Sequence, residues 1–316
     1  MSKGRKVLFL VQNDGYPHDT RVEKEAKTLM AAGYQVSVIC PRLQKKERLS
    51  DTVEGVHVYR FPIPRNKGGV IGYMLEYFYS VAAMFLLSLL VFFRRGFHVL
   101  HAHNPPDALF LIALFYKPLG KKFVFDQNDL VPELYLSRFG NEKSRIYKAL
   151  LWLEKMSCRL ADVVIGVNQS CQELETGRDG VPLAKTFVVR NAPDLERIKA
   201  LALNGHGSGE KGPVLLGYIG YLGAQDGVDY LLRSVHHLAY GLGRQDFRCV
   251  IIGDGDALQE LKSTARELKV EQFVNFTGRL PWPQAMKLLS TVDICVDPDP
   301  SSPLNERATM VKVLEY

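Results

Sequence analysis

Residues 215–232, LLGYIGYLGAQDGVDYLL, decide the fold predicted for the second half of the chain. An apolar strand runs into a glycine-rich loop, and this loop opens a helix. At such a junction the backbone N–H groups of the first helical turn converge, and the helix dipole favours negative charge there. Glycines let an anionic group approach the main chain closely. The stretch therefore predicts an anion-binding corner in a parallel α/β sheet.

Strand and helix alternate on both sides of this stretch. A first helix is expected to begin at Asp19 or Thr20 and to end at Gly33. Most of the expected strands are continuous Val, Ile, Leu and Phe runs, as in parallel sheets that are buried on both faces. The expected strands are residues 6–11, 35–40, 55–60, 97–102, 122–126, 162–167, 186–190, 214–219, 248–252, 272–276 and 292–297. The pattern predicts an α/β protein with two doubly wound, Rossmann-like domains.

The length of 316 residues favours two domains. We expect an N-terminal domain at residues 1–191, a linker at 192–213 that is rich in glycine, and a C-terminal domain at 214–316. The last helix has barely begun at Tyr316, and a doubly wound sheet usually needs further units to cover its edge. We therefore expect the second domain to be truncated, and the 316-residue piece alone to turn over poorly.

Composition narrows the class of ligand. The net charge of +6 is mild, and no basic stripe is interleaved with aromatic residues, which argues against nucleic acid. An anionic substrate or a membrane surface fits this charge. The five cysteines include no C-x-x-C pair, which argues against a disulfide framework or a zinc site and indicates a reducing compartment. We expect a cytoplasmic protein.

One segment raises the question of a membrane. Residues 80–93 are apolar, but a membrane span needs roughly 20 such residues. The strand at 97–102 must also pair with strands that precede the segment, so a crossing would divide the sheet. Two interpretations stay open: a buried crossover helix, and a helix that lies in the membrane interface and contacts the membrane through residues 70–95. The anchors of such an interfacial helix would be Tyr73, Tyr77, Phe78, Arg94 and Arg95.

Polar residues follow several strands of the first half, at the sheet edge where open α/β sheets bind ligands. His101 and His103 share a strand face; H-x-H can bind zinc, but no third ligand is near in sequence, so no metal is expected. His101 is expected to be structural and His103 to face the ligand. Arg21 and Glu25 lie one helical turn apart, which predicts an ion pair or a substrate contact. No G-x-G-x-x-G follows the first strand, which excludes a nicotinamide or flavin fingerprint.

Further strand ends carry candidate loops. The run 126–129, Asp-Gln-Asn-Asp, reads equally well as a cap with a turn or as part of a site. In the second half, Gly253-Asp254-Gly255, Thr277-Gly278 and the acidic run 297–300 each follow a strand, so these loops should meet on one rim.

The order of motifs resembles the family 4 glycosyltransferases, which are retaining enzymes of the GT-B fold. The resemblance rests on segments spread over essentially the whole chain: residues 19–26, 32–36, 101–103, 161–164, 190–194, 252–255, Lys312 and the pair Glu315-Tyr316. It implies two domains around a cleft, with an acceptor on the first and a nucleotide-diphosphate sugar on the second. It also implies no metal ion and no cofactor, the nucleotide sugar being the donor substrate.

The resemblance implies site residues. The catalytic residues would be His103, Asn128 and Asp126, and those on the acceptor side Asp14, Gly15 and Arg21. The donor would be bound by Gly220, Tyr221, Gly223, Asp226, Gly253, Asp254, Thr277, Gly278, Arg307, Lys312 and Glu315. Glu315 matches the second glutamate of the family's pair, which contacts ribose, and Lys312 matches a lysine that reaches phosphate.

Four positions depart from the family pattern. Arg307 stands in place of the first glutamate. Tyr221 and Asp226 stand in place of an arginine and a lysine of the glycine loop, and Asn128 stands in place of a histidine. These changes affect the neutralisation of the diphosphate and the chemistry on the acceptor side.

The expected function is hexosyl transfer, with retention, from a nucleotide-diphosphate sugar to a polysaccharide or lipid-linked acceptor of the cell envelope. The expected location is the cytoplasm, at the inner face of the membrane. Two alternatives are a nucleotide-sugar 2-epimerase and a non-catalytic nucleotide-sugar-binding protein. Incubation of the donor without acceptor distinguishes the epimerase, and binding without turnover distinguishes the binding protein.

Overall fold

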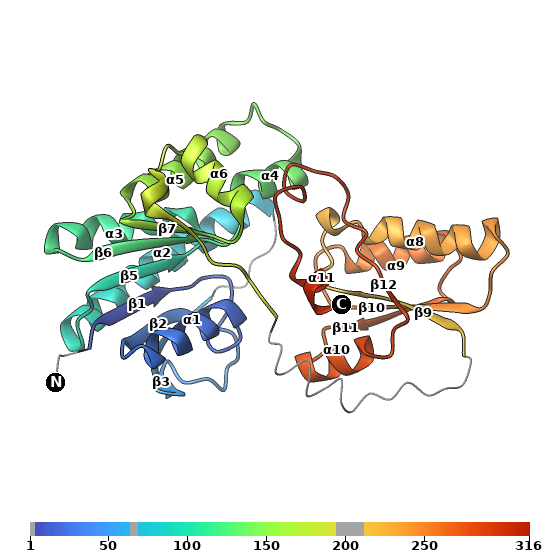
Figure 1. Ribbon diagram of the computed structural model, residues 1–316, viewed down its shortest axis with the longest axis horizontal. Helices are drawn as coiled ribbons and strands as arrows, with labels where there is room; N and C mark the ends of the chain where they lie inside the picture. The colour runs from blue at the N-terminus through green and yellow to red at the C-terminus, as the bar shows by residue number, and fades with distance from the viewer. Residues whose placement is uncertain (1–3, 64–68, 194–211) are drawn as a thin grey trace. The chain divides into compact units, whose positions relative to one another are not determined.

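The computed structural model describes residues 4–63, 69–193 and 212–316 (Figure 1). The chain divides into two compact units, Met1–Arg190 and Asn191–Tyr316. Most of the linker expected at 192–213 lies outside the described residues. Each unit is an α/β structure built on its own parallel sheet.

The sheet of the first unit has eight strands in the order β3-β4-β2-β1-β5-β6-β7-β8. All neighbours are parallel except β3, which pairs antiparallel with β4. The strands are β1 (Lys6–Leu10), β2 (Gln35–Arg42), β3 (Ser50–Val53), β4 (Val56–Pro62), β5 (Val99–His103), β6 (Lys122–Gln127), β7 (Val163–Gly166) and β8 (Thr186–Val188). The order places β1 and β5 centrally, so their carboxyl ends form the middle of the ligand-binding edge.

Helices cover both faces of this sheet. They are α1 (Thr20–Ala31), α2 (Gly69–Arg94), α3 (Phe110–Tyr116), α4 (Val131–Phe139), α5 (Arg145–Leu160) and α6 (Gln169–Gly177). Side chains of α1 pack with Phe9 and Val38 in one core cluster, and side chains of α2, α3 and α5 pack with Leu8 and Phe123 in another. Helix α1 begins where expected because the Asp19 carboxylate accepts hydrogen bonds from the Arg21 and Val22 N–H groups, both at 3.0 Å.

Helix α2 lies along the sheet. Its two ends join β4 and β5, which belong to one sheet, and Met84 and Val91 are buried against that sheet. Among the described residues, Gly72–Arg94 is the one helical stretch long and apolar enough to cross a membrane. Only 22% of its apolar 18-residue stretch is buried inside the structure. The helix therefore has one face on the core and a broad apolar face outside it.

The sheet of the second unit has four parallel strands in the order β11-β10-β9-β12. They are β9 (Val214–Ile219), β10 (Phe247–Ile252), β11 (Val274–Gly278) and β12 (Ile294–Cys295). The helices are α8 (Val228–His236), α9 (Leu258–Glu267), α10 (Trp282–Leu289) and the short α11 (Val311–Glu315). Tyr218, Leu232 and Ile251 are fully buried in the core between β9, β10 and α8.

The fold class predicted from the sequence is confirmed: both units are doubly wound α/β structures. The edge strand β3 was not expected, because Ser50-Asp51-Thr52-Val53 is polar and mostly exposed. It forms because Glu54 and Gly55, both with positive φ, turn the chain back into β4.

Candidate functional site

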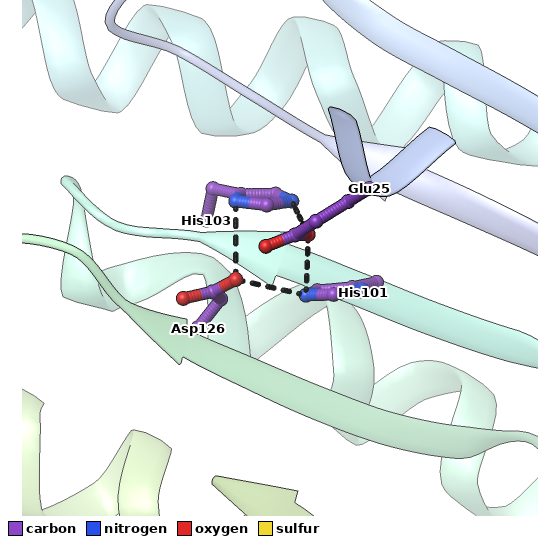
Figure 2. A group of neighbouring side chains, drawn as sticks. All are labelled: Glu25, His101, His103 and Asp126. Carbon is purple, nitrogen blue, oxygen red and sulfur yellow. Dashed lines mark hydrogen bonds and ion pairs between the residues drawn. The ribbon is translucent and has the colours of Figure 1, made fainter. Parts of the chain in front are cut away.

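Five polar side chains gather at the carboxyl edge of the first sheet. Arg21 and Glu25 come from α1, His101 and His103 from the end of β5, and Asp126 from the end of β6. Figure 2 shows the two imidazoles on either side of the carboxylates of Glu25 and Asp126. We call this set the α1–β5–β6 cluster.

The two histidines point to the same side of the sheet because they are two positions apart on β5, where neighbouring side chains alternate between the faces. Their rings stack with centroids 4.5 Å apart, and both contact the edge or face of the fully buried Phe9 ring. His101 Nε2 lies 3.3 Å from Asp126 Oδ2, and His103 Nε2 lies 3.6 Å from Glu25 Oε2. The positions of both imidazole rings on β5 therefore depend on contacts with Phe9 of β1 and with Glu25 of α1.

Arg21 is the cation of the cluster. Its Nη2 donates to Asp126 Oδ1 at 2.7 Å, its Nε donates to Asp126 Oδ2 at 3.2 Å, and its Nη1 donates to the Val189 carbonyl at 2.8 Å. Arg21 Nε also lies 3.1 Å from Glu25 Oε1. The two parallel hydrogen bonds to Asp126 suit a planar guanidinium, and they orient the Asp126 carboxylate toward the histidines.

Burial sets the protonation of these groups. It raises the pKa of Glu25 to about 9, with the neighbouring Asp126 adding to the shift and Arg21 opposing it. Burial would also raise the pKa of Asp126, but the hydrogen bond from His101 and the charge of Arg21 lower it on balance. Burial lowers the pKa of His103 to about 3. Burial therefore favours the uncharged forms of Glu25 and His103, and the hydrogen bond from His101 and the charge of Arg21 favour the charged form of Asp126.

The cluster also has the ligand types of a metal site. One atom from each of Glu25, His101, His103 and Asp126 lies within 4.8 Å of the others. The guanidinium of Arg21 already pairs with Asp126, however, so a metal ion would have to compete with Arg21 for that carboxylate. This ion pair favours a hydrogen-bonded cluster over a metal centre.

The neighbouring loop is organised by Asn104. Its Oδ1 accepts from the N–H groups of Asn128 at 2.6 Å and Asp129 at 3.0 Å, and its Nδ2 donates to Asp107 at 2.8 Å. Asn128 Nδ2 lies 3.4 Å from His103 Nδ1. Asn128 is half-buried, whereas His103 and Asp126 are buried. The Asn104 side chain thus fixes the loop at residues 128–129, and residue 126 of the same run belongs to the cluster.

The residues expected on the acceptor side separate. Arg21 belongs to the cluster, but Asp14 accepts a hydrogen bond from the Gly15 N–H within its own turn. The Gly15 carbonyl accepts from the His18 and Asp19 N–H groups and leads into α1. The roles expected of these residues, and of His103, Asn128 and Asp126, stay predictions.

A pocket of about 650 Å³ opens at the carboxyl edge of the second sheet. Of the donor-site residues expected from the sequence, Gly220, Tyr221, Gly253 and Asp254 line it. The remaining lining residues are Ile219, Ile252, Gly255, Asp256, Arg279, Leu280 and Ala285.

Glycines let the two loops of this pocket approach each other. A Cβ on Gly253, whose φ is +149°, would lie 1.9 Å from the Gly220 carbonyl oxygen. A Cβ on Gly255 would lie 2.5 Å from the Leu222 carbonyl oxygen. The Leu222 N–H in turn donates to the Asp254 carbonyl at 3.1 Å. Only glycine permits this backbone-to-backbone packing.

The two residues that replace basic ones in the glycine loop make local bonds. The Asp226 carboxylate accepts from the Gly223 N–H at 3.0 Å, in the short 3-10 turn before α8. The Tyr221 hydroxyl accepts from the Asp256 N–H at 3.3 Å and so links the two glycine loops. One N–H of the loop is therefore taken by a carboxylate of the chain itself.

The C-terminal candidates lie beside the same loop. Lys312 Nζ contacts Asp299 Oδ1 at 2.6 Å and Asp297 Oδ1 at 2.9 Å, and it sits over the Tyr218 ring. The Tyr316 hydroxyl accepts from the Ile219 N–H at 3.3 Å. The charge of Lys312 is thus compensated by two carboxylates, and its expected reach to phosphate stays a prediction.

The other expected donor residues take different places. The Thr277 hydroxyl donates to the Gly278 carbonyl at 2.9 Å, and Gly278 ends β11 with a φ of +71°. Arg307 and Glu315 are half-buried, in the turn before α11 and in α11 itself. The lining of the 650 Å³ pocket includes none of these residues.

Sequence reasoning left several residues of the pocket and the cluster unassigned, among them Arg279, Leu280 and Glu25. Arg279 and Leu280 line the pocket of the second unit, and the signal was their position directly after the β11 strand end. Glu25 was expected only as a partner of Arg21, yet it also lies 3.7 Å from His101 and 3.6 Å from His103.

Two Rossmann-like units, a glycine-lined pocket at the second sheet's carboxyl edge and the motifs above define the class of GT-B glycosyltransferases. The model of Glycosyltransferase Family 4 matches residues 19–197, and the model of Glycosyl transferases group 1 matches residues 213–316. The chain belongs to glycosyltransferase family 4. No curated protein matches the sequence.

Solved structures support the fold. Sucrose-phosphate synthase from Thermosynechococcus elongatus is 14% identical, with a TM-score of 0.73 over 98% of this chain and 78% of that chain. WaaG, a glycosyltransferase involved in lipopolysaccharide biosynthesis, is 14% identical, with a TM-score of 0.67 over the same shares. The catalytic domain of starch synthase IV from Arabidopsis thaliana, bound to ADP and acarbose, is 17% identical, with a TM-score of 0.63 over 99% and 81%.

Proposed function

We propose that this glycosyltransferase moves a hexosyl group, with retention, from a nucleotide-diphosphate sugar to a polysaccharide or lipid-linked acceptor. The observation that carries the proposal is the 650 Å³ pocket between the Gly220 and Gly253 loops, with Arg279 on its lining. Its size suits a nucleotide ligand. The ADP in the similar starch synthase structure supports the same ligand class.

The chemistry expected of the pocket is charge stabilisation. When the glycosidic bond to the donor breaks, negative charge builds on the leaving diphosphate and the sugar takes on oxocarbenium character. On the pocket lining, the Arg279 guanidinium is the cation suited to oppose that charge. Family membership supports retention, and we propose that the reaction needs no metal ion.

The first unit is proposed to hold the acceptor. Its carboxyl edge presents Asn128 at the surface of the α1–β5–β6 cluster, so a substrate hydroxyl would meet Asn128 before the buried His103. The long apolar helix α2 supports a cytoplasmic location at the inner face of a membrane, with contact through residues 70–95. That location suits a cell-envelope acceptor.

Binding and turnover of donors test the proposal. Isothermal titration with UDP, GDP and ADP is expected to show one saturable site, and Arg279→Ala is expected to weaken binding about tenfold, as for loss of a charge-assisted hydrogen bond. Arg266→Ala, on exposed α9, is the matched control and should bind normally. When the full-length protein is given donor sugars and lipid-linked acceptors, release of the nucleoside diphosphate should persist in EDTA, and NMR should show a product with the anomeric configuration of the donor.

Other outcomes would overturn it. If the protein forms an epimer from the donor in the absence of acceptor, its activity is 2-epimerisation and not glycosyl transfer. Binding without turnover of any donor by the full-length protein, in the presence of lipid-linked and polysaccharide acceptors, would favour a binding protein. Absence of binding by all three nucleotides would remove the donor site itself.

A further inference from the structure

Helices α2 and α3 expose an unusual number of large apolar side chains. Their exposed members are Met74, Leu75, Phe78, Leu86 and Phe93 on α2, Leu111, Leu114 and Phe115 on α3, and Leu119 just after α3. We call this set the α2–α3 face. Phe78 and Phe93 are 77% and 81% exposed, close to the exposure of side chains in an unfolded chain. Exposed apolar surface of this extent marks an interaction site.

The two helices pack directly against each other. The rings of Phe85 and Phe115 meet edge to face at 5.3 Å, and those of Phe92 and Tyr116 lie 5.5 Å apart. The Ser88 and Tyr116 hydroxyls are 2.8 Å apart in the buried layer beneath. Polar groups that pair below the surface leave an apolar exterior above them. The exposed side chains therefore project from a rigid, packed base.

Charge is absent from the middle of α2 and gathers at one end. From residue 69 to 93 the helix has a single charged side chain, Glu76, whose carboxylate accepts from Gln12 Nε2 at 2.9 Å. At the other end Arg94 and Arg95 are exposed, and Lys121 Nζ lies 5.4 Å from the centre of the Phe92 ring. An apolar face bordered by cations complements the interface of a bilayer that carries anionic headgroups.

We propose that the α2–α3 face docks on an anionic lipid bilayer, with its apolar side chains in the interface and Arg94, Arg95 and Lys121 at the headgroups. This deepens the membrane contact proposed above: it adds α3 to the contact and names the lipid charge, and it rests on the membrane location but not on glycosyl transfer. The helix lies flat, because both its ends join the same sheet.

Vesicle flotation of the 316-residue chain tests the docking. Vesicles of phosphatidylcholine with phosphatidylglycerol should bind the chain, and phosphatidylcholine alone should bind it weakly. The pairs Phe78→Ser/Phe93→Ser and Leu111→Ser/Leu114→Ser should each weaken binding at least about tenfold, since each removes two apolar side chains from the interface. Arg94→Gln/Lys121→Gln should weaken binding to the anionic vesicles about fivefold per charge.

Leu49→Ser/Leu183→Ser is the matched control, because both leucines are exposed on the same unit but belong to neither helix. It should bind like the parent, and all variants should keep the parent circular dichroism spectrum because the replaced side chains are exposed. A Phe93→Trp variant provides a second measurement: brominated lipid should quench its additional fluorescence.

Three results would overturn the proposal. They are no binding to anionic vesicles, an equal loss in the leucine control, and a dimer in sedimentation velocity that the Phe78→Ser/Phe93→Ser variant dissociates, which would make the face a contact between copies. Nucleotide titration in solution reports on the donor site separately, so a failure of either proposal is seen on its own.

Discussion

At the residue scale, Arg21 holds the α1–β5–β6 cluster together. Asp126 is fully buried, and Arg21 gives it two of its hydrogen bonds. Arg21→Met should therefore lower the free energy of unfolding by about 3–5 kcal/mol, the usual effect of leaving a buried charge without its partner. Urea unfolding at pH 7, followed by far-UV circular dichroism, measures the change.

The control and the rescue come from the same unit. Arg48 is exposed, so Arg48→Met should change the free energy of unfolding by no more than about 0.5 kcal/mol. The double change Arg21→Met/Asp126→Asn removes the orphaned charge and should recover much of the loss. An Arg21→Met protein as stable as the Arg48→Met control would show that the ion pair does not stabilise the fold.

The sequence predicted part of this cluster. The spacing of Arg21 and Glu25 and the H-x-H pair on β5 follow from helix and strand periods. The contact between Arg21 and Asp126 joins residues 105 positions apart, and no local pattern encodes it. His103 is buried partly by Phe9, which comes from β1, and this contact cannot be read from the residues around His103 in the sequence. The sequence alone therefore could not show how exposed His103 is.

At the scale of elements, the two glycine loops of the second unit are predicted to fail together. Gly255→Ala would put a Cβ 2.5 Å from the Leu222 carbonyl oxygen, so the β9 and β10 loops must separate. Nucleotide binding should fall by about tenfold or more, because a displacement of about 1 Å at a positioning group has effects of that size. Titration with the best-binding nucleoside diphosphate measures it.

Gly212→Ala is the matched control, since a Cβ there meets nothing within 4 Å and its φ is not positive. It should bind like the parent chain. If Gly255→Ala also binds like the parent, the close packing of the two loops does not shape the pocket.

Elements differed in how well the sequence predicted them. Buried parallel strands such as β1 and β9 are predicted well because their sequences are continuous apolar runs. The polar edge strand β3 carries no such signal, because its structure comes from pairing with β4. The same limit applies to Lys312: the family resemblance implies a contact with phosphate, which stays a prediction, but no local pattern shows its ion pairs with Asp297 and Asp299 in the segment after β12.

At the scale of the whole molecule, buried carboxyl groups make stability depend on pH. Burial raises the pKa of Glu175 to about 8 and of Asp107 to about 7. Between their unfolded values near 4 and these folded values, the folded state keeps protons that the unfolded state releases, so rising pH favours unfolding. His103 acts in the opposite sense: its lowered pKa makes the fold lose stability as pH falls from about 6.5 toward 3.

Glu175 offers the sharpest test of the alkaline limb. It is fully buried, and neither of its carboxylate oxygens has a hydrogen-bond partner among the described residues. Glu175→Gln cannot ionise, so it should be nearly as stable as the parent at pH 5 and more stable than the parent by about 4 kcal/mol at pH 9. Glu173→Gln, exposed on the same helix, should follow the parent at both pH values. Urea unfolding across this range measures the difference, and parallel curves for the parent and Glu175→Gln would show that Glu175 is ionised in the folded chain.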